Sequence, residues 1–199
     1  MTTDVPEVIT IAMMRQVLSV PLLCDALDAA GFPRQSPRLP ILPVTLPEVT
    51  LIGRCRTTLW ADMAHVDARP YELELQAVDS CEPDDVLICA ASGSCRSGIW
   101  GELLTTASKN RGCVGVIVDG HVRDISRMRQ MGFPVFARGA NPYDSRDRQR
   151  VIDVNVRVEL DGPRPGERRR HRAPQHVPHL GGFPLAECLD GLGQSRRGP

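Results

Sequence analysis

The sequence lacks several features that would place it in a specialised class of protein. No apolar run approaches the roughly eighteen residues of a membrane-spanning helix, and no basic segment precedes a long apolar stretch at the start of the chain. The seven cysteines are odd in number and contain no C-x-x-C pair, which argues against a disulfide framework. The formal net charge is zero. We therefore expect a cytoplasmic protein that binds no membrane and buries most of its cysteines.

Charge is unevenly distributed along the 199 residues. Residues 1–162 hold 17 basic and 21 acidic side chains, whereas residues 163–199 hold 7 and 3. A slightly acidic body argues against direct binding of nucleic acid over a broad surface. The length fits a single domain followed by a tail, and we place the domain at residues 1–162 and the tail at 163–199.

The most informative stretch of the chain is residues 100–124. Apolar residues at helical spacing, followed by a glycine, predict a helix at 102–111. Residues 114–118 form a short β-branched run that is typical of a strand. The pair Asp119-Gly120 then predicts a turn at which the chain reverses.

This stretch also carries the groups for a site that binds a small acid. The amides of Leu103 and Leu104 fall in the first helical turn, where they lack intrahelical partners and the helix dipole favours an anion. Arg123 has a planar fork that suits a carboxylate or enolate oxygen. Asp124 is a hard oxygen ligand that suits magnesium or manganese, and a helix, strand and turn would bring Glu102 near this pair.

Each of these residues also has an ordinary structural interpretation. An Arg-Asp pair after a strand is commonly a surface ion pair or a helix cap, and Glu102 alone is typical of a first helical turn. The combination favours function, because fold stability does not require anion donors, a cation and a metal ligand in one pocket. Asp144 and Asp147 could reach the same pocket or lie in a solvated loop.

The remaining elements follow from periodicity and turn residues, and their order indicates an α/β fold. Ser19 is expected to cap a helix that Gly31 ends. A proline-rich connector is expected at 32–47, and the loop at 92–94 is expected to border the pocket. The other predicted helices are 13–18, 70–78 and 125–131, and the other predicted strands are 49–61 with a bulge at Gly53, 86–90, 135–137 and 151–160.

The stretch resembles the RraA-like proteins. The resemblance lies in its E-x20-R-D frame, its G-E-L-L start and its V-D-G-x-V-R-D end. Further matches are C-D-A-L at 24–27, G-F-P-V-F-A-R-G at 132–139 and N-P-Y-D-S at 141–145, so the resemblance covers about residues 20–162. The family includes class II aldolases for 4-hydroxy-4-methyl-2-oxoglutarate and 4-carboxy-4-hydroxy-2-oxoadipate, which also decarboxylate oxaloacetate.

The resemblance implies a fold, an assembly and roles for particular residues. The fold would be the swivelling β/β/α domain, in homotrimers or hexamers whose sites lie between subunits. Asp124 would bind a divalent cation, Mg2+ or Mn2+, and Arg123 would contact the keto or enolate oxygen of a small 2-oxo acid. Glu102 would transfer a proton through a bound water. The segment that holds the pyruvyl carboxylate would be Gly101, Glu102, Leu103 and Leu104.

The expected function is therefore a metal-dependent retro-aldol cleavage that releases pyruvate, with oxaloacetate decarboxylation as a side activity. The alternative that the resemblance offers is a protein-binding regulator of ribonuclease E and RNA turnover without catalysis. Asp124 favours the enzyme, because an inhibitor has no need of a metal ligand beside a substrate arginine. No glycine-rich S-adenosylmethionine loop follows a first strand, which argues against a methyltransferase.

The family pattern ends at residues 161–162. The expected valine-rich strands are absent, and residues 161–182 hold five arginines, four prolines, four glycines and three histidines. One interpretation makes His171, His176 and His179 a metal-binding or RNA-binding tail, and another makes the segment a disordered basic appendage. We favour a shifted reading frame in GC-rich DNA, which would leave the activity of this chain open.

Overall fold

The computed structural model describes residues 8–33, 35–37 and 40–160, which fall into two compact units. The first unit contains the described residues up to 36, and the second contains those from 37 onward. The predicted boundary at residue 162, the three tail histidines and Cys188 lie outside the described residues.

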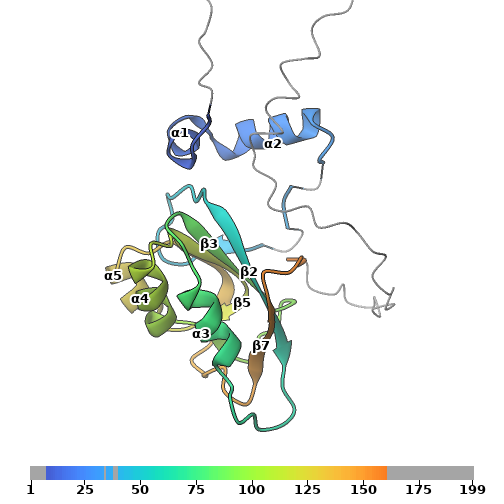
Figure 1. Cartoon of the computed structure of the whole chain (residues 1–199), viewed down its shortest axis with the longest axis vertical. Helices are drawn as coiled ribbons and strands as arrows, with labels where there is room; N and C mark the ends of the chain where they lie inside the picture. Colours follow the sequence, from blue (N-terminus) through green and yellow to red (C-terminus); the bar gives the residue numbers. More distant parts are fainter. Residues whose placement is uncertain (1–7, 34, 38–39, 161–199) are drawn as a thin grey trace, which may run out of the picture. The chain divides into compact units, whose positions relative to one another are not determined.

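The first unit consists of two short helices, α1 (Ile11–Val17) and α2 (Val20–Ala29) (Figure 1). The hydroxyl of Thr10 accepts a hydrogen bond from the Met13 amide at the start of α1. Ser19 caps α2 in the same way, which confirms the predicted cap. Gly31 has φ of +86°, a conformation that only glycine adopts without strain, and the chain leaves the helix there as predicted.

The second unit is built on a sheet that has seven strands among the described residues (Figure 1). Their order is β1-β6-β5-β3-β2-β7, and β4 also pairs with β5. β3 pairs in parallel with β2 and with β5, and β5 also pairs in parallel with β6 and with β4. Two pairs are antiparallel, namely β1 with β6 and β7 with β2. The strands are β1 (Leu42–Pro43), β2 (Arg54–Asp62), β3 (Asp85–Ala90), β4 (Gly98–Trp100), β5 (Gly115–Val122), β6 (Val135–Ala140) and β7 (Gln149–Val154).

Three helices of this unit lie side by side in Figure 1, namely α3 (Glu72–Asp79), α4 (Glu102–Asn110) and α5 (Ile125–Gln130). They match the predicted helices at 70–78, 102–111 and 125–131 to within two residues. The α/β class predicted from the sequence is confirmed.

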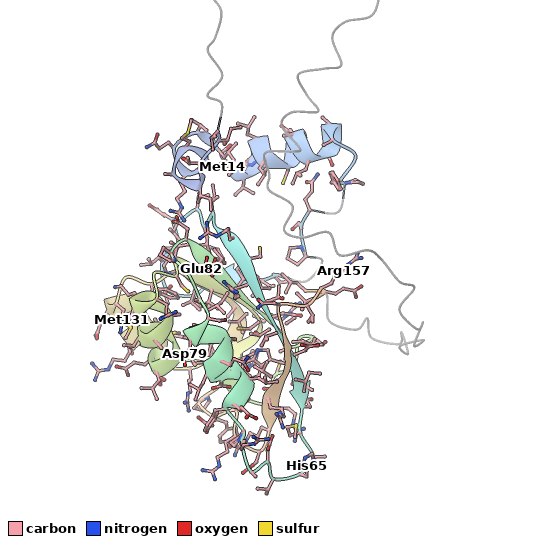
Figure 2. All side chains as sticks on the ribbon, in the orientation of Figure 1. Met14, His65, Asp79, Glu82, Met131 and Arg157 are labelled. Carbon is pink, nitrogen blue, oxygen red and sulfur yellow. The ribbon has the colours of Figure 1, made fainter. Side chains whose placement is uncertain are left out.

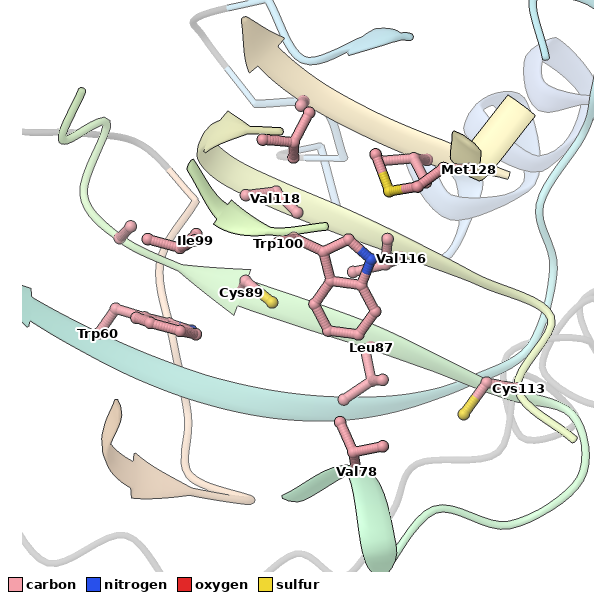
Figure 3. Close-up of a cluster of buried hydrophobic side chains, with 14 of the residues drawn as sticks. Trp60, Val78, Leu87, Cys89, Ile99, Trp100, Cys113, Val116, Val118 and Met128 are labelled. Atoms are coloured by element: carbon pink, nitrogen blue, oxygen red, sulfur yellow. The ribbon is translucent and has the colours of Figure 1, made fainter. Parts of the chain in front are cut away.

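The core of the second unit lies along the central parallel strands (Figure 3). Every residue of β3 is buried, which explains its continuous apolar run because a parallel strand is covered on both faces. Trp60 and Trp100 pack into the same cluster as Leu87 and Val116. Of the six described cysteines, Cys81, Cys89 and Cys113 are buried, Cys24 is half-buried, and Cys55 and Cys95 are exposed.

The predicted turn at Asp119-Gly120 is wrong, because β5 continues through both residues to Val122. Asp119 is buried and paired with Arg138 on the neighbouring strand β6, so its charge is compensated inside the sheet. A Cβ atom at Gly120 would lie 3.3 Å from the Cβ of Ala91 and 3.2 Å from the Ser94 carbonyl oxygen. The glycine therefore permits close packing of the chain and does not mark a reversal.

Other boundaries also differ from the prediction. β2 begins at Arg54, after Gly53, and its irregularity lies between Leu59 and Trp60, where its pairing with β7 shifts. β7 ends at Val154, well before the predicted end at Leu160. The predicted connector at 32–47 contains the strand β1, and the strand β4 was also not predicted. Strands of two or three residues are too short to show a periodic pattern.

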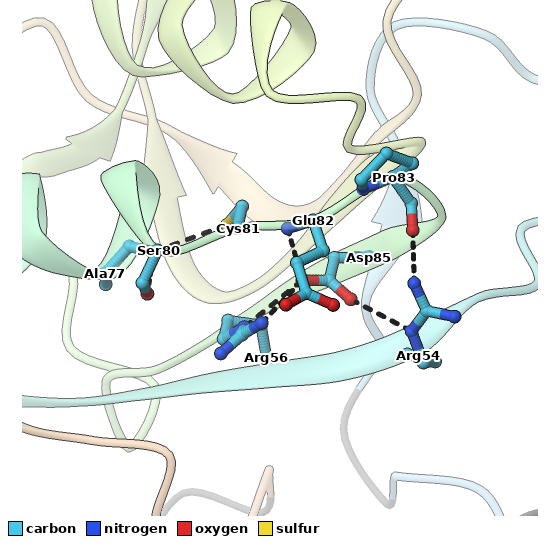
Figure 4. A network of polar contacts seen from close by, with 8 residues as sticks. All are labelled: Arg54, Arg56, Ala77, Ser80, Cys81, Glu82, Pro83 and Asp85. Atoms are coloured by element: carbon cyan, nitrogen blue, oxygen red, sulfur yellow. Dashed lines mark hydrogen bonds and ion pairs between the residues drawn. The ribbon is translucent and has the colours of Figure 1, made fainter.

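A buried carboxylate ties the starts of β2 and β3 together (Figure 4). The Asp85 side chain is only 3% exposed, and its Oδ2 lies 3.0 Å from Arg56 Nη2. Its Oδ1 lies 3.4 Å from Arg54 Nε, and Oδ2 also accepts a hydrogen bond from the Glu82 amide. Because the Arg56 side chain is only 21% exposed, loss of the Asp85 carboxylate would leave a poorly solvated charge without its partner.

We predict that Asp85→Asn lowers the free energy of unfolding by about 2–4 kcal/mol, because it leaves the Arg56 charge without its partner in a buried position. Urea unfolding would measure the loss. The control is Asp79→Asn on α3, an exposed residue labelled in Figure 2, which should change stability by less than about 0.5 kcal/mol. Equal unfolding midpoints for the two variants would contradict a stabilising role for the buried pair.

Candidate active site

The site forms where the connection from β4 to α4 packs against the end of β5. The backbone amide of Arg123 donates a 2.8 Å hydrogen bond to the Trp100 carbonyl. A Cβ atom at Gly101 would lie 2.7 Å from Asp124 Oδ2 and 2.9 Å from Arg123 Cγ, and one at Gly98 would lie 3.0 Å from Arg123 Cβ. Only glycines allow this approach, so both positions serve to bring the Arg-Asp pair against the start of α4.

The first turn of α4 presents free amides at this junction. Its N-cap is Gly101, which has no side chain to cap the helix, and the first intrahelical bond runs from the Thr105 amide to the Gly101 carbonyl. The Glu102 amide donates to Asp124 Oδ2 at 3.3 Å. The amides of Leu103 and Leu104 also precede the first intrahelical donor, so the helix start can bind an anion.

The buried Trp100 side chain holds the start of α4 in place. Its indole Nε1 donates to the Thr105 hydroxyl at 2.8 Å, and both residues are buried. The tryptophan thus joins β4 to the first turn of the helix and fixes the direction of the free amides.

Arg123 is the cation of the site. Its side chain is 30% exposed, and Nη2 lies 2.7 Å from Asp144 Oδ2 while Nε lies 3.7 Å from Asp124 Oδ2. The strong pair is therefore with Asp144, which the sequence left open as either a pocket residue or a solvated one. Asp147, which was considered together with Asp144, instead has its Oδ2 atom 3.9 Å from Nε of the neighbouring Arg146.

Asp144 is held by several donors. The Tyr71 hydroxyl and the Arg146 amide donate to its Oδ1 at 2.7 and 2.8 Å. Burial raises the pKa of Asp144, but these hydrogen bonds and the Arg123 charge outweigh it and keep the pKa below its ordinary value. Burial and the bond to Asp144 raise the pKa of Tyr71 to about 12, so the phenol remains a donor at neutral pH. Asp144 is therefore an ionised acceptor that positions Arg123.

Glu74 of α3 is the most perturbed carboxyl group of the site. Its exposed fraction is 8%, and its Oε2 has no hydrogen-bond partner among the described residues. Burial raises the pKa of Glu74 to about 8, Asp144 adds to the increase and Arg123 partly offsets it. Glu74 is thus largely protonated at neutral pH.

These groups surround one cavity of about 200 Å³. This volume is below the range of drug-sized pockets and suits a small metabolite. Its lining residues are Tyr71, Glu74, Leu75, Gly98, Ile99, Trp100, Gly101, Leu103, Leu104, Arg123, Asp144 and Ser145.

The structure brings most of the predicted site residues to this cavity. Gly101, Leu103, Leu104 and Arg123 line it. Glu102 and Asp124 are outside the lining but meet beside it through the Glu102 amide and the Asp124 carboxylate. The loop at 92–94, which was expected to border the pocket, contributes no lining residue.

The sequence analysis missed Tyr71 and Glu74. Both lie at the start of α3, and the signal that could have revealed Glu74 is its position on the apolar face of that helix. Glu74, Ala77 and Val78 are the buried residues of α3, at positions i, i+3 and i+4. A charged residue in such a stripe requires either a partner or a function.

The residues at the cavity can be compared with the needs of a divalent cation. No group of three or more His, Cys, Asp or Glu side chains that could hold a metal occurs in the described part of the chain. Magnesium, however, keeps several waters and is commonly bound through one or two carboxylates plus substrate oxygens. Asp124 suits this mode, because its side chain is 41% exposed and can therefore reach a hydrated cation. The donor set fits a cation held by a single protein carboxylate.

Comparison with known proteins defines the class to which this chain belongs. The family described as RraA-like, Aldolase/RraA, matches residues 20–166. The chain therefore belongs to the RraA-like family.

No helix within the described ranges is long and apolar enough to cross a membrane.

Two curated relatives of the chain carry the name of an aldolase. The chain is 33% identical over 95 residues to a Halalkalibacterium halodurans protein named "Putative 4-hydroxy-4-methyl-2-oxoglutarate aldolase", with 47% of this chain and 45% of the relative covered. A Shewanella oneidensis protein of the same name is 35% identical over 75 residues, with 38% and 45% covered. The chain thus spans less than half the length of these curated relatives.

A solved structure shares the fold of the chain. Streptomyces coelicolor RraAS2, described as an unusual member of the RNase ES inhibitor RraA protein family, superimposes with a TM-score of 0.66 at 25% identity. The match covers 76% of this chain and 73% of that one.

The Glu74 environment predicts a pH-dependent stability. In the unfolded chain the Glu74 carboxyl group loses its proton near its ordinary pKa of 4.5. In the folded protein its pKa is raised to about 8, so the group keeps the proton over a wider pH range. The contribution of Glu74 to stability is thus fully present below pH 4.5 and is lost as pH rises through about 8. At about 1.4 kcal/mol per pKa unit, the loss amounts to a few kcal/mol at most.

Urea unfolding between pH 5 and pH 9 would measure this effect in the wild type and in Glu74→Gln. The wild type should lose stability across this range, and Glu74→Gln should lose less. The matched control is Glu72→Gln, which changes an exposed glutamate on the same helix and should keep the wild-type slope. Parallel curves for the wild type and Glu74→Gln would contradict the buried, protonated state.

Proposed function

We propose that this chain is a divalent-metal-dependent lyase that cleaves a 4-hydroxy-2-oxo acid of the 4-hydroxy-4-methyl-2-oxoglutarate type to pyruvate, with oxaloacetate decarboxylation as a side activity. The observation that carries the proposal is the convergence of the α4 amides and Arg123 on one small cavity, with Asp124 beside it. Membership of the RraA-like family and the names of the curated relatives support it.

The start of α4 would bind the carboxylate of the pyruvyl part of the substrate. The amides of Leu103 and Leu104 are free for such an anion, and the helix dipole adds to the attraction. Gly101 leaves room for the carboxylate to approach the backbone, since a side chain there would already collide with Arg123.

Arg123 would stabilise negative charge on the keto oxygen of the substrate as the C–C bond breaks. Such donors are effective when they are aimed in advance at the atom on which charge develops. Asp144 provides this positioning, because it holds Nη2 at 2.7 Å and is itself held by Tyr71. Arg123 lines the cavity, so a guanidinium N–H other than the one paired with Asp144 would donate to the substrate.

Asp124 would hold the divalent cation, Mg2+ or Mn2+. A bound cation at this position supplies Lewis-acid stabilisation of the developing enolate charge. Glu102, a half-buried residue in the first turn of α4, would accept the proton of the C4 hydroxyl through a water molecule. Homotrimeric or hexameric assembly and a cytoplasmic location remain predictions, as does the identity of the physiological 2-oxo acid.

We predict that Arg123→Ala and Asp124→Asn each lower kcat/KM by at least about 100-fold, which is about 2.7 kcal/mol of lost transition-state stabilisation. Asparagine is chosen over alanine at position 124 because Asp124 has φ of +54°, a conformation that asparagine tolerates. Asparagine also keeps an acceptor for the Glu102 amide, so the change removes mainly the charge. Both variants should unfold near the wild-type temperature.

Pyruvate release would be followed with coupled lactate dehydrogenase, from 4-hydroxy-4-methyl-2-oxoglutarate and from oxaloacetate. Reactions with Mg2+ or Mn2+ would be compared with chelator-treated protein and with a metal-only blank. Asp79→Asn serves as the control for an acid remote from the cavity. Wild-type rates in both site variants would refute the assignment.

The second candidate is a protein-binding regulator of RNA turnover, which the likeness to Streptomyces coelicolor RraAS2 favours. This function predicts a folded oligomer with no metal-dependent pyruvate release, and binding to ribonuclease E that survives Asp124→Asn. The same set of variants thus separates the two functions.

A further inference from the structure

Glu74 is the one strongly perturbed carboxyl group at the cavity to which the proposed function assigns no role. It occupies the core-facing side of α3 together with Ala77 and Val78, where the helical pattern calls for an apolar residue. A structural acid in such a place would be expected to form an ion pair or a full set of hydrogen bonds. Glu74 Oε2 instead has no partner within the described residues, so stability alone does not explain this side chain.

Glu74 is one of the residues that line the same cavity as the first turn of α4 and Arg123. The groups that face it there are Tyr71 of α3, Asp144 of the loop after β6, and Arg123 at the end of β5. Tyr71 and Asp144 are bonded to each other, and Arg123 is paired with Asp144. Glu74 is therefore left to hold its proton beside the space that a substrate would fill.

We propose that Glu74 is a catalytic acid that delivers a proton to C3 of the pyruvate enolate formed in the cavity. This inference rests on the proposed lyase function and adds a residue that the sequence motifs do not contain. It divides the proton transfers between two carboxyl groups in different environments. The half-buried Glu102 serves the C4 hydroxyl, and the buried Glu74 serves the carbon.

The proposed step balances without a co-reactant other than water. Cleavage of the C3–C4 bond, or loss of CO2 from oxaloacetate, leaves the bonding electron pair in the enolate. The Glu74 O–H bond then breaks as the C3–H bond forms, which yields the methyl group of pyruvate and the Glu74 carboxylate. The carboxylate regains its proton from water after pyruvate has left. The reverse of this step exchanges the methyl hydrogens of pyruvate with solvent.

The experiment isolates that reverse step. Pyruvate is incubated with the Mg2+-loaded protein in D2O, and loss of the methyl signal is followed by proton NMR. The wild type should exchange at a rate that rises with pH through about 8, where Glu74 becomes a carboxylate that can accept the proton. Glu74→Gln, which keeps the size of the side chain, should lower the exchange at least 100-fold at pH 8 and above, where the wild type carries the carboxylate. Glu72→Gln should exchange like the wild type.

Two further readouts separate proton transfer from binding and folding. Calorimetric titration with pyruvate and Mg2+ should give Glu74→Gln an affinity within threefold of the wild type. In the metal-free protein at neutral pH, infrared difference spectroscopy between the wild type and Glu74→Gln should show the C=O stretch of a protonated carboxyl group. A lost affinity, or the absence of this band, would overturn the proposal.

The outcomes also distinguish this inference from the proposed function. If the wild type releases pyruvate and Glu74→Gln exchanges the methyl hydrogens at the wild-type rate, Glu74 is not the acid and the lyase function stands. If the folded wild type releases no pyruvate with either metal, the lyase function fails, and the role of Glu74 fails with it.

Discussion

The hydrogen bond from the Arg123 amide to the Trp100 carbonyl joins the two halves of the candidate site. Glycine at position 98 allows this approach, since a Cβ atom there would lie 2.9 Å from the Val122 backbone carbon. Glycine at position 101 leaves room for the Arg123 side chain, whose Cγ would lie 2.9 Å from a Cβ atom. The buried Trp100 indole then orients the first turn of α4 through Thr105. A guanidinium, a carboxylate and a row of free amides thus come together with little freedom to move apart. Catalytic groups held in this way lose little free energy to reorganisation during a reaction.

The parallel sheet explains why these residues meet although they are far apart in the chain. β4, β5 and β6 run parallel, and each is followed at its carboxyl end by part of the site. Gly101 follows β4, Arg123 follows β5, and Asp144 lies in the loop after β6. In open α/β sheets, ligands bind beyond the carboxyl ends of the strands. The arrangement here follows that rule, and α3 adds Glu74 and Leu75 to the lining of the cavity.

The carboxyl groups around Arg123 differ in protonation because their surroundings differ. Asp144 receives hydrogen bonds from Tyr71 and from the backbone, so it remains ionised and pairs with the arginine. Glu74 is more deeply buried and lacks such donors at Oε2, so it retains its proton near neutral pH. A neutral Glu74 also avoids a further negative charge close to Asp144, which would weaken the attraction of the cavity for an anion.

The sequence by itself determined the α/β class, most helix positions and the residues of the 101–124 motif, because helical periodicity, caps and glycines act over short distances along the chain. It misjudged Asp119-Gly120 as a turn, since only the packing of β5 between β3 and β6 buries that aspartate against Arg138. The short strands β1 and β4 likewise depend on partners distant in sequence. Helical spacing could have marked Glu74 as a core-facing acid of α3. The place of Tyr71 at the cavity and the pairing of Arg123 with Asp144 were decided by tertiary structure alone, because burial and ion pairing depend on which elements the fold brings together.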